Sequence, residues 1–293
     1  MTVSSVCQHP PVLRRSGRSR SREAARPADP NAVPLLAGRY RLAGLAGRGA
    51  TASVWRARDE LLDRDVAVKQ FHKWHPHDVV EARIAARVRH PNVVAVHDVV
   101  QQRGSCWLVM DYHRGTTLAT LIRGGRKLPP PVVAALGQQL LAALRAVHAA
   151  GVVHCDVKPA NLLVGADGHL VLIDFGIAET DGNPAHPGRR NGYIIGSPTY
   201  MAPELIRGEA PRPPVDLWSL GATLYAAVEG RPPFPQRDPI PTLAAVLHDP
   251  PSPTRLAGPL QPLLAQLLVK DPQERACHAA IHALLTDASH PRA

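Results

Sequence analysis

The chain has 293 residues and a formal net charge of +10, with 45% hydrophobic, 20% charged and 4% aromatic residues. This length allows one large domain or two lobes with a buried core, and the composition is that of a folded rather than a disordered protein. The four cysteines are widely spaced and form no CxxC pair, which argues against a zinc cluster or a disulfide framework and fits a reducing compartment.

The positive charge alone is weak evidence for nucleic-acid binding. Arginine accounts for 29 of the 34 basic residues, which are spread along the chain apart from one N-terminal cluster, so we expect no nucleic-acid partner. A secretory signal is not expected, because arginines occupy the place of its apolar segment. The most apolar stretch, residues 131–151, is interrupted by Gln138, Gln139 and Arg145, so we expect a cytoplasmic protein without a membrane segment. The oligomeric state stays open.

The first predicted segment, residues 1–36, is a basic tail. It is rich in Arg, Ser and Pro and lacks apolar periodicity, which predicts disorder. Such a tail can bind an acidic partner or be an inert extension. The inert interpretation is favoured, because the composition carries no further signal.

Residues 37–112 have the pattern of short strands joined by turns. Apolar residues at helical spacing predict one helix within this part, at residues 77–88. The strands are predicted as a pair joined by a glycine turn across residues 40–59, followed by strands at 64–71, 92–100 and 106–110.

Residues 113–288 are predicted to be mostly helical, with a short C-terminal tail at 289–293. A long helix should begin at Pro129 and end at Gly151. Two short strands are expected at 161–164 and 169–174, and later helices at 216–228, 242–248, 260–269 and 276–285. The predicted fold class is therefore α+β, with a strand-rich first part, a helix-rich second part and a hinge near residues 111–115.

The stretch GRGATASV contains the first candidate site. Gly47 and Gly49 match the opening of a GxGxxG loop, in which Ala52 replaces the third glycine. A dinucleotide-binding fold needs a helix after the glycines, whereas SVWRARD alternates as a strand does. The glycines are therefore predicted at the tip of a hairpin, where backbone N–H groups can approach phosphates because no Cβ intervenes.

Two charged residues follow this hairpin. Lys69 ends the apolar strand VAVK, and Glu81 stands on the predicted helix. A lysine at the edge of a strand can simply extend to solvent. Alternatively, an ion pair with Glu81 would hold its ammonium where it can meet phosphate oxygens.

The segments HCDVKPAN and LIDFG supply a second group of candidates: Asp156, Lys158, Asn161 and Asp174. Each alone could be an ordinary turn or loop residue. Together they offer a base for a hydroxyl group, a cation for a transferring phosphoryl group and two oxygen ligands for a hard metal ion.

These segments belong to a longer ordered series: GRGATASV, VAVK, Glu81 before HPNVV, HCDVKPAN, DFG, SPTYMAPE, DLWSLG, EGRPPF and KDPQER. Across about residues 40–287 the chain thereby resembles the eukaryotic-like serine/threonine protein kinases, in particular their bacterial, Hanks-type members. The resemblance implies the bilobal protein-kinase fold, with residues 37–112 as the ATP-binding lobe and 113–288 as the catalytic lobe. It also implies ATP and Mg²⁺, with Mn²⁺ as an alternative metal, as cofactors and protein Ser/Thr hydroxyls as acceptors.

The resemblance implies a role for each matching residue. Asp156 would accept the proton of the hydroxyl group, Lys158 would steady the γ-phosphate, and Asn161 and Asp174 would bind the metal. The ATP-binding residues would be Gly47, Gly49, Val54, Ala67, Lys69, Glu81, Met110, Asp111, His113 and Leu163.

Within the implied nucleotide site, the adenine would lie between Val54 and Ala67 on one side and Leu163 on the other. Met110 would be the gatekeeper, and backbone groups of Asp111 and His113 would bond the purine edge. The remaining matches are implied to be structural: His154, Phe175, Glu204 paired with Arg275, and Asp216.

The chain departs from the family at Cys155, where most members have an arginine that receives a phosphate from the activation loop. The loop between Gly176 and Ser197 contains one threonine, Thr180, and no serine. We therefore expect a kinase that does not need activation-loop phosphorylation. Cys155 itself is interpreted as a small buried filler rather than a redox-sensitive thiol. The connection from Lys69 to Glu81 is short for the family, so the helix is expected to lack a turn.

Two other functions compete with that of an active protein kinase. A pseudokinase that serves as a binding scaffold is disfavoured because Lys69, Asp156 and Asp174 are all retained. A small-molecule phosphotransferase is disfavoured because it would not carry SPTYMAPE. Lys158 and Thr199 match the Ser/Thr branch of the family, which predicts Ser or Thr rather than Tyr acceptors.

Overall fold

The computed structural model describes residues 35–49, 52–72, 83, 85–102, 104–175, 179–180, 189–190, 193–194 and 197–289. The predicted N-terminal tail lies outside these residues except at its end. There the compact unit begins at Leu35, before the predicted boundary, because Leu36 is buried and forms a β-bridge with Tyr40. The predicted C-terminal tail is described only at Ser289, which is the last residue of a helix.

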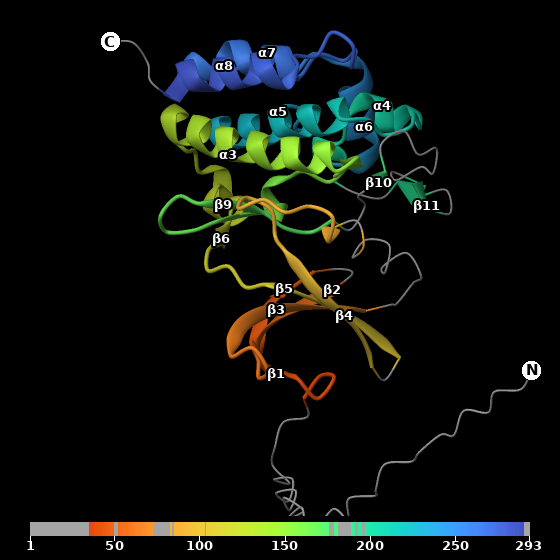
Figure 1. Ribbon diagram of the computed structural model, residues 1–293. Coiled ribbons are helices and arrows are strands. Elements are labelled where there is room, and N and C mark those ends of the chain that lie inside the picture. The colour runs from red at the N-terminus through yellow and green to blue at the C-terminus, as the bar shows by residue number, and fades with distance from the viewer. Residues whose placement is uncertain are drawn as a thin grey trace, which may run out of the picture. The chain divides into compact units, whose positions relative to one another are not determined.

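An antiparallel sheet of five strands forms the first part of this unit, in the order β1-β2-β3-β5-β4 (Figure 1). Its strands are β1 (Tyr40–Arg48), β2 (Ala52–Asp59), β3 (Arg64–Phe71), β4 (Val96–Gln102) and β5 (Ser105–Asp111). All five are predicted, but β4 starts later than expected because the residues before it contact the second part of the unit. Val93 forms a β-bridge with Leu172, and the Val94 N–H donates to the Leu172 carbonyl.

Residues 77–82 and 84 of the predicted helix at 77–88, Glu81 among them, lie outside the described residues. Within that range Arg83 and Ala85 are helical. The expected Lys69–Glu81 pair and the expected loss of a helical turn therefore stay predictions.

Strand β3 shows how side-chain alternation serves both the core and the site. Val66 and Val68 are fully buried in a hydrophobic cluster that also contains Tyr40. Ala67 belongs instead to the main hydrophobic core and, with Lys69, lines a cavity on the opposite face of the strand. The same strand thus contributes to the core of the sheet and to a wall of the site.

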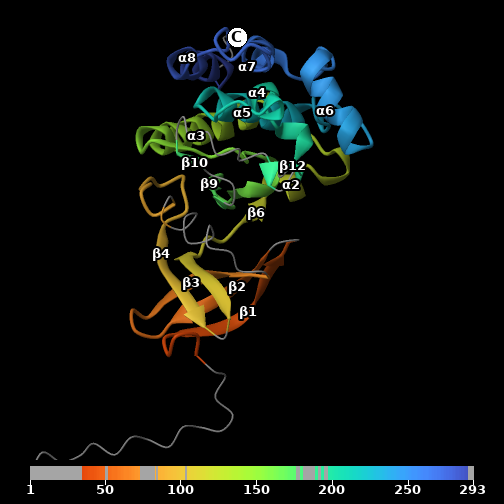
Figure 2. The ribbon, with the colours of Figure 1, turned by 90° about the vertical axis from the view of Figure 1, so that its right-hand side faces the viewer.

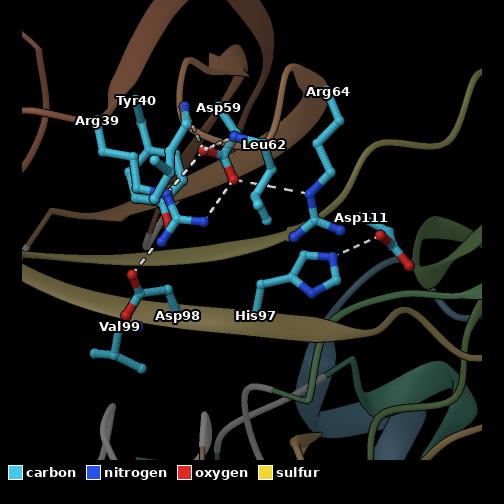
Figure 3. A network of polar contacts seen from close by, with 10 residues as sticks. Arg39, Tyr40, Asp59, Leu62, Arg64, His97, Asp98, Val99 and Asp111 are labelled. Carbon is cyan, nitrogen blue, oxygen red and sulfur yellow. Dashed lines mark hydrogen bonds and ion pairs between the residues drawn. The ribbon is translucent and has the colours of Figure 1, made fainter.

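A polar network anchors the start of the sheet (Figure 3). The buried carboxylate of Asp59 accepts two hydrogen bonds from the Arg39 guanidinium, at 2.8 and 2.7 Å, and one each from the N–H groups of Leu61 and Leu62. The hydrogen bonds from Arg39 lower the pKa of Asp59 to about 2. Beside it, the Tyr40 hydroxyl donates to Asp98 at 2.9 Å.

The second part of the unit is mostly helical (Figures 1 and 2). Its longer helices are α3 (Pro130–Ala149), α5 (Pro214–Glu229), α6 (Pro239–His248), α7 (Gln261–Leu267) and α8 (His278–Ser289). Helix α3 packs against α5 and α8, and α5 also packs against α7. All five helices are predicted, with ends that differ by a few residues. Helix α5 is buried from Val215 to Glu229, as expected for a helix that is apolar on every side.

The short elements between these helices carry much of the site. Helices α2 (Leu118–Leu121) and α4 (Pro203–Arg207) are not predicted, because four or five residues are too few to show a helical period. The short strands are β6 (Thr116–Thr117), β7 (Val152–Val153), β8 (Leu162–Val164), β9 (Leu170–Leu172), β10 (Glu179–Thr180), β11 (Arg189–Arg190) and β12 (Tyr193–Ile194). Single 3-10 turns are η1 (Arg123–Gly125), η2 (Pro159–Asn161), η3 (Pro198–Tyr200) and η4 (Gly258–Leu260).

Within the described part of the chain, one helix is long and apolar enough by length and composition to cross a membrane. This is α3, and half of its apolar stretch is buried inside the protein. Its buried residues include Leu140 and Leu144, which belong to the main hydrophobic core. Core helices of this kind commonly meet the same criterion.

Candidate active site

A cavity of about 360 Å³ lies between the sheet and the short strands of the second part. Val54 and Ala67 line it from the sheet, and Leu163 lines it from β8, as predicted for the two sides of an adenine pocket. The other predicted residues that line it are Gly47, Lys69, Met110, Asp111, His113 and Asp174. The volume and the largely apolar walls are those of a small-molecule site.

Gly49 is the one described member of the predicted nucleotide site that does not line this cavity. Its N–H donates to the Ala52 carbonyl at 2.8 Å and so closes the end of the β1–β2 hairpin. Gly47 pairs with Val54 across the two strands. The glycines therefore lie at a hairpin end, as predicted from the alternation of SVWRARD.

The hinge between the two parts of the unit begins at Asp111, the last residue of β5. Its N–H donates to the Ala95 carbonyl at 3.0 Å, so this residue has only its own carbonyl to offer to a purine edge. Its side chain is directed to His97 on β4, whose Nε2 lies 2.6 Å from Asp111 Oδ1 (Figure 3). This contact is absent from the sequence-based expectations, because the two residues belong to different strands.

Lys69 and Asp174 are joined although 105 residues separate them. The Lys69 ammonium donates to Asp174 Oδ1 at 2.8 Å, and the lysine is almost completely buried at 6% exposure. The simple alternative, a lysine extended to solvent, is therefore wrong. Asp174 has a positive φ of 74°, a conformation that aspartate tolerates better than most residues.

The catalytic-loop candidates lie around one carboxylate. Asp156 Oδ2 accepts from Lys158 Nζ at 2.6 Å and from Asn161 Nδ2 at 3.0 Å. Asn161 Nδ2 also donates to the Asp156 carbonyl at 2.9 Å. Among the described residues, both side-chain contacts fall on Oδ2, which leaves Oδ1 of Asp156 to receive a proton.

The two predicted metal ligands come from adjacent segments. The Ile173 N–H donates to the Asn161 carbonyl at 2.9 Å, which sets Asp174 beside Asn161 in the fold. Since the Asn161 amide nitrogen is used by Asp156, its amide oxygen remains for a cation. An amide oxygen and a carboxylate are hard ligands that suit Mg²⁺, which usually completes its coordination with phosphate oxygens and water. The residues present therefore fit a metal–nucleotide complex.

Asp216 on α5 holds the loop before Asp156 through hydrogen bonds to the loop backbone. Its fully buried carboxylate accepts the N–H groups of His154 and Cys155, both at 2.8 Å. It also bonds Nε2 of His148, on α3, at 2.7 Å. Cys155 has a positive φ of 63°, which is costly for a residue with a Cβ, so these two bonds are needed to fix the loop.

The residues predicted to be structural also lie as expected. The His154 ring packs on the Phe175 ring at 4.9 Å, and burial lowers the pKa of His154, which favours a neutral packing residue over an acid or base. Arg275 bonds Glu204 at 2.7 and 3.2 Å, which confirms that predicted pair. Thr199 lies in η3, and among the described residues no hydrogen bond joins it to Lys158, so its role in specificity stays a prediction.

Sequence reasoning missed His148 and His278. His148 Nδ1 lies 3.1 Å from Nε2 of His278, the first residue of α8. His148 lies near the C-terminus of α3, where a histidine commonly bonds the last carbonyls of the helix. From the sequence alone, this common role would be the expected one. The only available signal would be the pairing with Asp216, which is distant in the chain.

Comparison with known proteins places this site in a family. The protein kinase domain matches residues 40–286 of the chain. The chain is 34% identical to the probable serine/threonine-protein kinase SCO3848 of Streptomyces coelicolor, over 82% of this chain and 38% of that protein. It is 35% identical to the serine/threonine-protein kinase PknE of Mycobacterium tuberculosis, over 87% of this chain and 48% of that protein.

A second mycobacterial relative, the serine/threonine-protein kinase PknD, is 34% identical over 90% of this chain and 42% of that protein. The chain therefore spans less than half the length of these three relatives. It belongs to the protein kinase family, with the α+β fold that the resemblance implied.

Proposed function

We propose that this protein transfers the γ-phosphoryl group of ATP to Ser or Thr hydroxyls of other proteins. The observation that carries the proposal is that Lys69 and Asp174 pair in the wall of one cavity, while the Asp156 loop is joined to the segment of Asp174 by the hydrogen bond from Ile173 N–H to the Asn161 carbonyl. The relatives' names as serine/threonine-protein kinases support the choice of acceptor. The apolar walls at Val54 and Leu163 suit a purine ring, and the polar end at Lys69 suits phosphates.

Each side chain has a chemical task in this proposal. Asp156 Oδ1 takes the proton of the acceptor hydroxyl, which raises the nucleophilicity of its oxygen. Lys158, 2.6 Å from Asp156 Oδ2, provides a cation beside the position of the transferring phosphoryl group. Asn161 and Asp174 would hold Mg²⁺, which when bound neutralises charge on the phosphate oxygens. Lys69 would orient the α- and β-phosphates.

The test uses purified protein, Mg²⁺ and radiolabelled ATP, with one basic and one acidic generic protein as acceptors. Asp156→Asn should lower turnover by on the order of 10²–10⁴-fold, because the base is lost while the shape is kept. Asp167→Asn is the matched control, since this exposed aspartate lies in the β8–β9 turn and, among the described residues, bonds only the nearby His169 N–H. Equal incorporation by wild type and Asp156→Asn would refute the role given to Asp156.

A pseudokinase scaffold is the alternative that the same experiment distinguishes. A scaffold would raise its melting temperature with ATP and Mg²⁺ yet give no transfer to either acceptor above the Asp156→Asn background. Retention of Lys69, Asp156 and Asp174, with Lys69 bonded to Asp174 and Asp156 bonded to Lys158, favours catalysis.

We further propose that activity does not require a phosphate on the activation loop. Cys155 occupies the place of the family's phosphate-receiving arginine and is buried, with its Sγ directed to the Val153 carbonyl. Most of the loop, including the side chain of Thr180, lies outside the described residues. Phosphatase-treated and untreated protein should have equal activity, and a collapse of activity after treatment would reject this proposal.

A further inference from the structure

Three side chains from three helices form a hydrogen-bonded chain that ends at the catalytic loop. His278 Nε2 on α8 lies 3.1 Å from His148 Nδ1 on α3, and His148 Nε2 lies 2.7 Å from Asp216 Oδ2 on α5. Asp216 in turn holds the N–H groups of His154 and Cys155, directly before Asp156. Asp216 is fully buried, whereas His278 is only partly buried.

The Asp216 carboxylate, at the end of this chain of hydrogen bonds, determines which histidine nitrogen atoms carry a proton. Burial opposes the charge of Asp216, but the hydrogen bonds from His148 and from the His154 N–H prevail and hold its pKa below the usual range. An ionised carboxylate only accepts, so His148 must carry a proton on Nε2. When His148 is neutral, its Nδ1 atom is an acceptor, so His278 donates to it through Nε2–H.

The partner of one imidazole nitrogen thereby selects the tautomer of the ring. If His148 carried its proton on Nδ1 instead, the Nε2 lone pair would face the Asp216 carboxylate and repel it. A donor at His278 Nε2 excludes that tautomer. Burial, with smaller contributions from His148 and Arg145, lowers the pKa of His278, so at neutral pH it is an uncharged donor.

We propose that His278 is a positioning residue for phosphoryl transfer. It fixes the tautomer of His148 and thereby keeps the Asp216 carboxylate hydrogen-bonded to the backbone of the catalytic loop. This inference rests on the proposed kinase function. The hydrogen bonds from the loop to Asp216 matter because Cys155 is held at a φ of 63°, a conformation that relaxes unless its N–H is fixed. A relaxed Cys155 would move the neighbouring Asp156 away from the acceptor hydroxyl.

Three variants separate positioning from simple packing. His278→Gln keeps an N–H donor near the place of Nε2, His278→Leu keeps the bulk but has no donor, and His282→Leu is the control. His282 is exposed on the same helix, one turn further on. His278→Leu should lower kcat about fivefold, the effect of one lost hydrogen bond, with little change in KM for ATP. His278→Gln should restore most of this loss, and His282→Leu should match the wild type.

A spectroscopic measurement tests the tautomer directly. In protein labelled with ¹⁵N-histidine, the side-chain signals of His148, assigned by their loss in His148→Gln, should report the Nε2–H tautomer in the wild type. In His278→Leu they should shift toward a mixture with the Nδ1–H form. A packing role alone would leave these signals in place.

Specific outcomes overturn the inference. It falls if His278→Leu and His278→Gln have the same kcat, or if wild-type His148 carries its proton on Nδ1. If His278→Leu does not fold, the wild-type tautomer and the activity of His278→Gln still decide the question. Absence of transfer by the wild type to any acceptor would refute the proposed function instead, and the tautomer measurement would remain informative.

Discussion

Lys69 on β3 and Asp174 before Phe175 form an ion pair of 2.8 Å that joins the sheet to the second part of the unit. In the proposed reaction both residues act on the nucleotide phosphates, so this pair fixes two binding groups relative to each other. Replacement of Lys69, which is proposed to bind phosphates and also pairs with Asp174 across the site, should therefore affect catalysis much more than stability.

Lys69→Met is therefore expected to lower phosphoryl transfer by on the order of 10²–10³-fold, as for the loss of one charged group that stabilises the transition state. Single-turnover assays measure the effect, and circular dichroism reports whether the fold is kept. Lys127→Met is the matched control, because Lys127 is exposed and has no ion-pair partner among the described residues. Similar losses in both variants would contradict a specific role for Lys69.

The Glu204–Arg275 pair should matter for stability rather than for chemistry. Arg275 has a side-chain exposure of 0% and Glu204 of 4%, and Arg275 also donates to the Val269 and Pro214 carbonyls. Removal of one partner leaves a buried charge unpaired. We expect Arg275→Met to lower the free energy of unfolding by about 3–5 kcal/mol, measured by urea denaturation.

The control for this pair is Arg207→Met. Arg207 lies 3.7 Å from Glu209, and their side chains are 44% and 52% exposed. A solvent-exposed pair of this kind contributes at most about 1 kcal/mol. If the two variants lost equal stability, burial would not be what gives the Glu204–Arg275 pair its importance.

Stability should also depend on pH through Asp59. Its folded-state pKa of about 2 lies below the ordinary 3.8, so the unfolded chain binds a proton first on acidification. The stabilising contribution is fully present above about pH 4 and is lost as the pH falls toward 2. Asp59→Asn should be less stable than the wild type by on the order of 1–2 kcal/mol at pH 7, from the loss of charge-assisted hydrogen bonds.

Urea denaturation of both proteins at pH 7, 4 and 2 tests this expectation, since the difference between them should fall to a small part of its neutral-pH value at the lowest pH. Asp63→Asn serves as the control, because the Asp63 side chain is 89% exposed. A difference between wild type and Asp59→Asn that stayed constant across this range would exclude Asp59 as its source.

The sequence predicted much of this fold because its signals are local. Alternation predicted β2, a short apolar run predicted β3, and apolar spacing with flanking Pro and Gly predicted α3. The resemblance implied Ala67 as an adenine residue and Lys69 as a phosphate residue, and both line one cavity because the alternation in β3 sets them on the same face. Local patterns thus placed the strands and helices that carry the site, whereas the site residues themselves were implied by the resemblance to the family.

Contacts between distant residues were not predictable in the same way. His148 bonds Asp216 and His278 from 68 and 130 positions away, and no periodicity connects them. The Arg39–Asp59 network likewise depends on how the β2–β3 turn folds back on the segment before β1. Such pairs are set by tertiary packing, which a single sequence does not encode as a pattern.

Ala67 provides the most direct test of the nucleotide cavity. Leucine at this position would extend into the cavity of about 360 Å³ toward Leu163, where the adenine is proposed to lie. Since the cavity offers room, Ala67→Leu should leave the melting temperature of the free protein nearly unchanged but weaken ATP binding by about tenfold or more, close to 1.4 kcal/mol. The shift in melting temperature with ATP and Mg²⁺ measures this affinity.

For Ala57→Leu, in the same sheet, we expect the opposite result: a loss of stability without a loss of ATP binding. Ala57 is buried in the cluster with Val66 and Val68, away from the cavity, so extra carbon atoms have no space there. This variant should lose about 1–3 kcal/mol of stability through overpacking while its response to saturating ATP is retained. If Ala67→Leu bound ATP as the wild type does, the adenine would not lie between Ala67 and Leu163, and the nucleotide site would have to be placed elsewhere.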